Sequence, residues 1–179
     1  QQFLMEVLTD TLQYKGEDHV INKIKEFKEK FDAMKPWEKG TPKAVNGLTK
    51  YQDRKDQALA AKLQGKKVQL TIPGHVTASM NWNLLRKTNN DHHTSPIIDG
   101  QKIIVCKLHE TADNVMKSVA YPIDESHLPD WFIELPFDED AMRDAIVDQK
   151  IKNLLGVLNW DLARANKQTA HMESLFDFG

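Results

Sequence analysis

The chain has 179 residues, of which 40% are hydrophobic and 28% charged, and its formal net charge is −2. This length suits one domain with a buried core, or one domain with a small added lobe. No stretch approaches the roughly 20 apolar residues that a membrane-spanning helix needs, and the N-terminus carries no secretory signal pattern. The composition therefore predicts a soluble globular protein. With a single cysteine, Cys106, we expect a reducing, intracellular compartment.

Two amphipathic helices are predicted first, over residues 1–13 and 17–35, with Gly16 between them. The second places its apolar side chains on one face: Val20, Ile21, Ile24, Phe27, Phe31 and Met34. Pro36 ends it, followed by Gly40 and Pro42. The chain begins at Gln1 without a methionine, which indicates a piece of a longer protein or a processed product.

The central region is predicted to be irregular over residues 36–55, with a turn at Gly47 in AVNGLTKY. A short helix over 56–64 and a strand over 66–72 follow. The stretch PGHVTASMNWNLLRK, residues 73–87, then predicts an amphipathic helix with proline near its first turn. A polar loop follows at residues 89–91.

Two strand patterns, residues 102–108 and 115–123, predict a β-hairpin. Cys106 lies in the first, where we expect a buried, inert thiol. Helices are predicted over residues 128–135 and 138–158, the latter with Asp138 as its N-cap. The expected fold is therefore α+β and mainly helical, with a small antiparallel β insertion.

Catalytic and metal-binding patterns are weak. His92 and His93 are adjacent, next to Asp91, but they lack the three- or four-residue spacing that places two ligands on one helix face, so we expect an exposed polar loop there. The acidic run 138–140 favours the positive end of a helix dipole over a bound cation. No phosphate-binding glycine loop or nucleophile motif occurs. The sequence thus indicates binding surfaces rather than an active site.

Charge is distributed unevenly, with about +6 over residues 1–90 and about −8 over residues 91–179. We define residues 39–87 as the basic segment, in which ten cationic residues face only Asp53 and Asp56. These cations are Lys39, Lys43, Lys50, Arg54, Lys55, Lys62, Lys66, Lys67, Arg86 and Lys87. The pattern fits either a polyanion-binding surface or an ordinary solvated face. His75, at the start of a predicted helix, is either a phosphate contact or a capping or packing residue.

The C-terminus raises a separate question, because Leu175, Phe176 and Phe178 stand among the last five residues. These side chains either dock on their own domain or bind another protein. Residues 159–173 become polar along their length, which suits a tether and favours a partner.

Several of these stretches, in this order, resemble one family. They are VINKIKEFKEKF, AVNGLTKY, PGHVTASMNWNLLRK, IIDGQKIIVCKL and the terminal SLFDFG. The chain resembles the C-terminal thumb domain of the family B replicative DNA polymerases of T-even-type bacteriophages. In that family the thumb is helical with a small β insertion and closes over the primer–template duplex.

The resemblance implies a domain arrangement and a set of contact residues. The thumb would cover residues 1–170, with a helical base at 1–35 and 128–170, a DNA-contacting insertion at 36–127 and a flexible clamp-binding tail at 171–179. The family's Lys-Tyr pair falls on Lys50 and Tyr51, and its histidine falls on His75. The candidate DNA-binding residues are Lys43, Lys50, Tyr51, Arg54, Lys55, Lys66, Lys67, His75, Arg86, Lys87, Lys150 and Lys152.

Two departures from the family occur in the last long helix. A lysine pair spaced four apart falls on Asp148 and Lys152, so only Lys152 is kept, and Lys150 is the candidate substitute for the first. The family's proline after this pair is Asn153. These departures concern individual phosphate contacts rather than the surface as a whole.

The resemblance also implies binding partners, and it identifies the polymerase domains that this chain lacks. The tail residues Ser174, Leu175, Phe176, Asp177 and Phe178 would bind a sliding clamp. The palm aspartates that hold two metal ions, the fingers and the exonuclease carboxylates are absent. We therefore expect no polymerase activity from this chain alone, no cofactor in it, and Mg²⁺ only in the missing palm.

The expected partners are primer–template DNA, the clamp and the remaining polymerase domains on the same or another chain, without a membrane, in the cytoplasm of an infected bacterium. Whether the chain is an excised fragment or the small subunit of a split polymerase stays open. A stand-alone clamp-binding accessory protein is the alternative.

Overall fold

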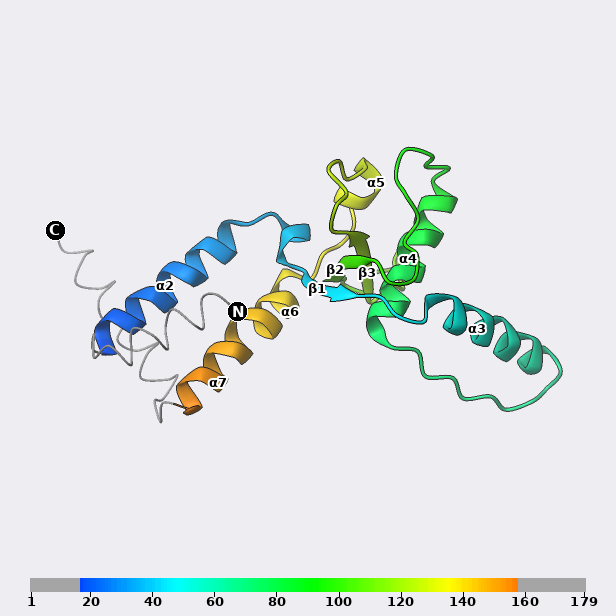
Figure 1. The fold of residues 1–179 in the computed structure, drawn as a ribbon, viewed down its shortest axis with the longest axis horizontal. Helices are drawn as coiled ribbons and strands as arrows, with labels where there is room; N and C mark the ends of the chain where they lie inside the picture. Colours follow the sequence, from blue (N-terminus) through cyan, green and yellow to red (C-terminus); the bar gives the residue numbers. More distant parts are fainter. Residues whose placement is uncertain (1–16, 158–179) are drawn as a thin grey trace. The chain divides into compact units, whose positions relative to one another are not determined.

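A computed structural model describes residues 17–157, which separate into two compact units (Figure 1). The helical unit comprises the described residues 17–34 and 143–157, and the sheet unit comprises residues 35–142. The sequence placed residues 128–142 with the helical base, whereas they pack within the sheet unit. The predicted helix at residues 1–13 and the C-terminal tail lie outside the described residues.

The helical unit contains α2 (Glu17–Ala33), which confirms the predicted second helix. Its apolar spacing buries Val20, Ile21, Ile24 and Phe31. The predicted helix from residue 138, whose residues up to Met142 belong to the sheet unit, is also confirmed, as consecutive segments α6 (Glu139–Arg143), η2 (Asp144–Asp148) and α7 (Gln149–Val157). Asp138 caps it as expected, since its Oδ1 accepts the Ala141 N–H at 2.9 Å. The middle segment, η2, has π-helical geometry.

The sheet unit is built on three antiparallel strands in the order β1-β2-β3. These strands are β1 (Thr41–Ala44), β2 (Lys102–Lys107) and β3 (Ser118–Pro122). Val105 of β2 lies opposite Thr41 on one side and Ala120 on the other. The predicted hairpin is therefore confirmed, and the fold is α+β and helix-rich. A short helix, η1 (Pro36–Lys39), leads into β1.

One helix, α4 (Gly74–Thr88), packs on this sheet mainly along β3. It confirms the helix predicted from PGHVTASMNWNLLRK. Its Trp82 is fully buried and lies 5.3 Å, between ring centroids, from Phe132 of α5 (Asp130–Ile133). The Phe132 ring also contacts the rings of Tyr121, Trp131 and Phe137. This aromatic cluster joins α4, α5 and the sheet into one core.

Cys106 lies in the same core, fully buried on β2 as predicted. Burial raises the pKa of its thiol to about 12, so the reactive thiolate is suppressed. The Cys106 Sγ and the Tyr121 hydroxyl both donate to the Trp37 carbonyl oxygen, at 3.3 and 3.1 Å. These bonds fix η1 against the sheet.

Two central predictions are wrong. Residues 36–55 are not irregular, because they form η1, β1 and the first half of α3 (Leu48–Leu63), a helix that begins well before residue 56. Residues 66–72 are not a strand of the sheet. Val68, Leu70 and Ile72 are half-buried in alternation with exposed neighbours, so the period of two reflects an extended segment that packs without a pairing strand.

Candidate nucleic-acid interface

Half of the exposed cations of the basic segment lie on α3, which extends away from the sheet in Figure 1. At 100° per residue, its four cations fall within an arc of about 140° around the helix axis. These cations are Lys50, Arg54, Lys55 and Lys62. The carboxylates of Asp53 and Asp56 fall outside that arc. One side of α3 is therefore positive, and the cations on it are exposed.

Tyr51 organises two of these cations. The Lys50 Nζ lies 5.9 Å and the Arg54 Cζ 5.8 Å from the centroid of the half-buried Tyr51 ring. A cation over an aromatic face is held by the ring quadrupole. The Lys-Tyr pair named from the sequence thus forms one cluster with Arg54 in the first half of the helix.

The N-terminal end of α3 is held by Asp99, a residue that was not singled out from the sequence. Asp99 lies in a turn about fifty residues later, and its carboxylate accepts the backbone N–H groups of Leu48 and Thr49. These donors, Thr49 first, hold the pKa of Asp99 below its ordinary value. Gly47 precedes the helix with φ 81° and Gly100 follows Asp99 with φ 85°, a conformation that favours glycine. The Asp-Gly pair in IIDGQK was the available signal for a turn.

The far end of α3 is closed by Gly65, whose φ is 76°. The Lys66 N–H donates to Ala61 O at 3.0 Å, and the Gly65 N–H donates to Lys62 O at 2.9 Å. This pair of bonds is a Schellman motif, which satisfies the last carbonyls of a helix. It places the exposed residues Lys66 and Lys67 directly beyond the helix end.

A groove of about 470 Å³ runs between α3 and α4, and we call it the α3–α4 groove. Its lining comprises Leu48, Thr49, Gln52, Asp53, Lys55, Met80, Asn81, Asn83, Leu84 and Lys87. The structure thus brings together two predicted contact residues, Lys55 and Lys87, from different helices. His75 is half-buried in the first turn of α4.

Arg86 has a structural role that the sequence did not indicate. Its Nε donates to Thr94 O at 2.5 Å and lies 3.1 Å from Thr94 Oγ1. Trp82 and Asn83 on the same helix also bond to this loop, at Ser95 O and at Ile97. Arg86 therefore helps to fasten the loop over residues 89–101 to α4.

Asp91 organises that loop from within. Burial alone would raise its pKa, but hydrogen bonds from the His93 and Thr94 backbones, the Thr94 hydroxyl and the Trp131 indole lower it to about 2. His92 and His93 are exposed, as expected for a polar loop. Within residues 17–157, no three His, Cys, Asp or Glu side chains form a group that could hold a metal ion.

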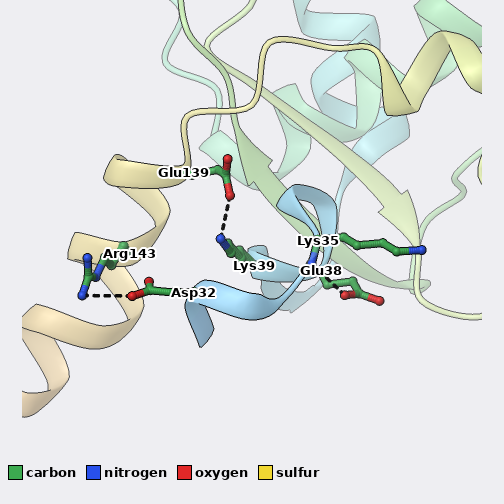
Figure 2. Close-up of polar contacts among 6 residues, drawn as sticks. All are labelled: Asp32, Lys35, Glu38, Lys39, Glu139 and Arg143. Carbon is green, nitrogen blue, oxygen red and sulfur yellow. Dashed lines mark hydrogen bonds and ion pairs between the residues drawn. The ribbon is translucent and has the colours of Figure 1, made fainter. Parts of the chain in front are cut away.

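Lys39 is one of the ten cations of the basic segment, but it is not part of the exposed basic surface. Its Nζ lies 2.6 Å from the Glu139 Oε1, a contact drawn as a dashed line in Figure 2. Its side chain is only 6% exposed. Glu139 offsets this charge inside the sheet unit. The basic residues of β1 and α3 remain part of the exposed surface. Lys43, on the edge strand β1, is exposed, as are the four cations of α3.

The other predicted contact residues are distributed beyond this surface. Lys150 and Lys152 are exposed on α7 in the helical unit. Asp148, which stands at the family's first lysine position, forms an ion pair with Lys28 at 3.8 Å. The predicted clamp-binding residues, 174–178, lie outside the described residues.

No protein-family model matches the chain, and a search of curated proteins found no match. Over residues 17–157, no helix combines the length and the apolar character that crossing a bilayer requires.

Proposed function

We propose that this chain is the duplex-binding thumb of a phage family B DNA polymerase, tethered to a sliding clamp by Ser174–Phe178. The observation that carries the DNA-binding part is the one-sided positive face of α3, with Lys50, Arg54, Lys55 and Lys62 on one arc. The clamp-binding part is supported by the sequence of the tail alone. The chain would act in the cytoplasm of an infected bacterium, and Mg²⁺ would be needed only by the missing palm.

The physical argument concerns sequence-independent binding. A replicative polymerase must hold every sequence, so its duplex contacts should be made to phosphates and sugars rather than to base edges. Lysine and arginine on a helix with both ends fixed supply such contacts. The Asp99 cap and the Gly65 motif hold α3 at its two ends, so little ordering would be needed on binding.

The test is fluorescence anisotropy of the full chain with a labelled primer–template over about 50 to 200 mM salt. Each phosphate contact contributes about 0.9 to the slope of log K against log [salt]. We expect Lys50→Gln with Lys55→Gln to weaken binding and lower the slope by up to about 2. The matched control is Lys102→Gln with Lys107→Gln, two exposed lysines on β2, which should change neither quantity.

A salt-independent affinity, or an equal effect of the two double variants, would contradict the proposal. The alternative of a stand-alone accessory protein makes a different prediction. Mixing the chain with a polymerase segment that carries the palm should restore synthesis if the chain is a thumb, and should not if it is an accessory protein. Deleting residues 174–179 should abolish clamp-dependent processivity without changing the melting temperature, whereas a large drop in that temperature would show that the tail belongs to the core.

A further inference from the structure

Two leucines on α3 are exposed in a place that packing does not explain. The exposed fraction is 58% for Leu59 and 82% for Leu63. They stand four residues apart and continue the row that begins at Lys55, so all three lie along one side of the helix. Single exposed apolar residues are common, but an aligned pair at the end of a projecting helix forms a continuous apolar strip.

Most of the charged residues around this strip are cationic, and the exception is Asp56, three residues before Leu59 on the same helix. Lys55 precedes it in the same row, Lys62 is adjacent to Leu63 in sequence, and Lys66 with Lys67 follows the helix end. No Asp or Glu occurs between Asp56 and Asp91. The Gly65 motif fixes the chain at this point through the Lys66–Ala61 backbone bond. The strip therefore lies in a region of net positive charge.

We propose that Leu59 and Leu63 pack against the deoxyribose faces of the DNA duplex while the neighbouring cations hold its phosphates. This inference rests on the proposed function and identifies which part of the duplex the end of α3 contacts. On a DNA backbone the apolar surface lies on the sugars, directly between the anionic phosphates. A cation-flanked apolar strip is complementary to that alternation. Sugar contacts are also independent of base sequence.

The consequence is a component of affinity that salt does not screen. Phosphate contacts weaken as counterions compete, whereas apolar burial does not depend on counterion release. Replacing both leucines should therefore weaken binding by a similar factor at every salt concentration. Replacing the nearby lysines should change the salt slope instead.

The experiment compares three double variants of the full chain by anisotropy with a labelled primer–template. Leu59→Gln with Leu63→Gln should lower affinity about tenfold, as expected for partial burial of two leucines, with an unchanged salt slope. Lys62→Gln with Lys66→Gln should lower the slope. The matched apolar control is Ile98→Gln with Val115→Gln, whose side chains are 64% and 84% exposed elsewhere in the sheet unit, and it should leave binding intact.

The outcomes separate the inference from the proposed function. Salt-dependent binding that is equal in the wild type and the double-leucine variant would overturn the sugar contact and leave the DNA-binding thumb standing. No duplex binding by the wild type would overturn both. The same strip could instead contact an anionic membrane. Cosedimentation with phosphatidylcholine–phosphatidylserine vesicles that requires Leu59 and Leu63, without a leucine effect on DNA binding, would reject the sugar contact.

Discussion

Asp91 should stabilise the sheet unit through its charged carboxylate, and Asp91→Asn tests this directly. The substitution keeps one oxygen acceptor but removes the charge and the second oxygen. The wild-type Asp91 Oδ2 accepts the Trp131 Nε1–H at 3.0 Å and the Thr94 hydroxyl at 2.9 Å. The Trp131 bond connects the loop at residues 89–101 to α5, and the Thr94 bond holds the loop's own conformation. Weakening both should reduce the stability of the whole unit.

The magnitude follows from the pKa. The difference between the ordinary value of 3.8 and about 2 for Asp91 corresponds to at most about 2.5 kcal/mol, because one pKa unit is about 1.4 kcal/mol. The side chain is partly exposed, so solvent screening should reduce this contribution to about 1 to 2 kcal/mol. The pKa is lower in the folded state. The stabilisation is therefore fully present above the unfolded pKa, near 4, and is lost as pH falls towards 2.

The assay is urea unfolding of wild type and Asp91→Asn at pH 7 and at steps down to about pH 2.5. We expect the variant to be less stable by about 1 to 2 kcal/mol at pH 7, and the gap to shrink as pH falls below about 4. Asp113→Asn, at an exposed loop position, is the matched control and should track the wild type. Equal stability at pH 7, or a gap that persists unchanged at pH 2.5, would refute the electrostatic reasoning.

Three further substitutions test the packing of the sheet unit by urea unfolding. In Gly40→Ala the new Cβ would lie 2.5 Å from the Ile104 Cγ2, so we expect the free energy of unfolding to fall by about 1 to 3 kcal/mol. Gly74 has open space around it, so Gly74→Ala should not destabilise the protein. Equal effects of the two substitutions would contradict this reasoning. Phe132→Ala removes the centre of the aromatic cluster and should cost about 3 to 5 kcal/mol, and a loss below 1 kcal/mol would mean that the rings are not tightly packed. Gly65→Ala forces a side chain to φ 76° and should cost about 1 to 2 kcal/mol, with weaker duplex binding as a second readout; full stability would show that the motif does not constrain the end of α3.

Periodicity was sufficient where an element forms its own hydrogen bonds. The helices at 17–33 and 74–88 satisfy their backbone internally, so their apolar spacing and flanking proline or glycine predict them from local sequence alone. The β2–β3 pair was also predictable, because both strands have apolar runs separated by a polar turn. In each case the information lies within one short stretch.

The failures involve partners far away in sequence. β1 contains Pro42 and is only four residues long, and it is a strand because β2, sixty residues later, pairs with it; proline is tolerated on such an edge. The start of α3 depends on the Asp99 carboxylate, which no local pattern reveals. Conversely, residues 66–72 have the alternation of a strand but no neighbour to pair with. In all three segments, the presence or absence of a hydrogen-bonding partner far away in sequence determined the structure.

The candidate surface shows the same division between local and distant information. The cations of α3 could be named from composition, and their separation from Asp53 and Asp56 follows from helical geometry once the helix is known to begin at Leu48. Lys39 could not be assigned from sequence, since the burial of its side chain and its pairing with Glu139, one hundred residues away, are tertiary facts.

The groups that hold α3 in place are distinct from the groups that we propose bind DNA. Asp99 and Gly65 fix its ends through backbone hydrogen bonds, while the side chains of Lys55 and Lys62 remain exposed to solvent. A lysine can therefore be replaced without disturbing the helix, and the helix end can be disturbed without removing a charge. The effect of removing a charge and the effect of disturbing the helix end can therefore be measured independently on the same helix. If the contact residues were buried, replacing them would disturb the helix as well.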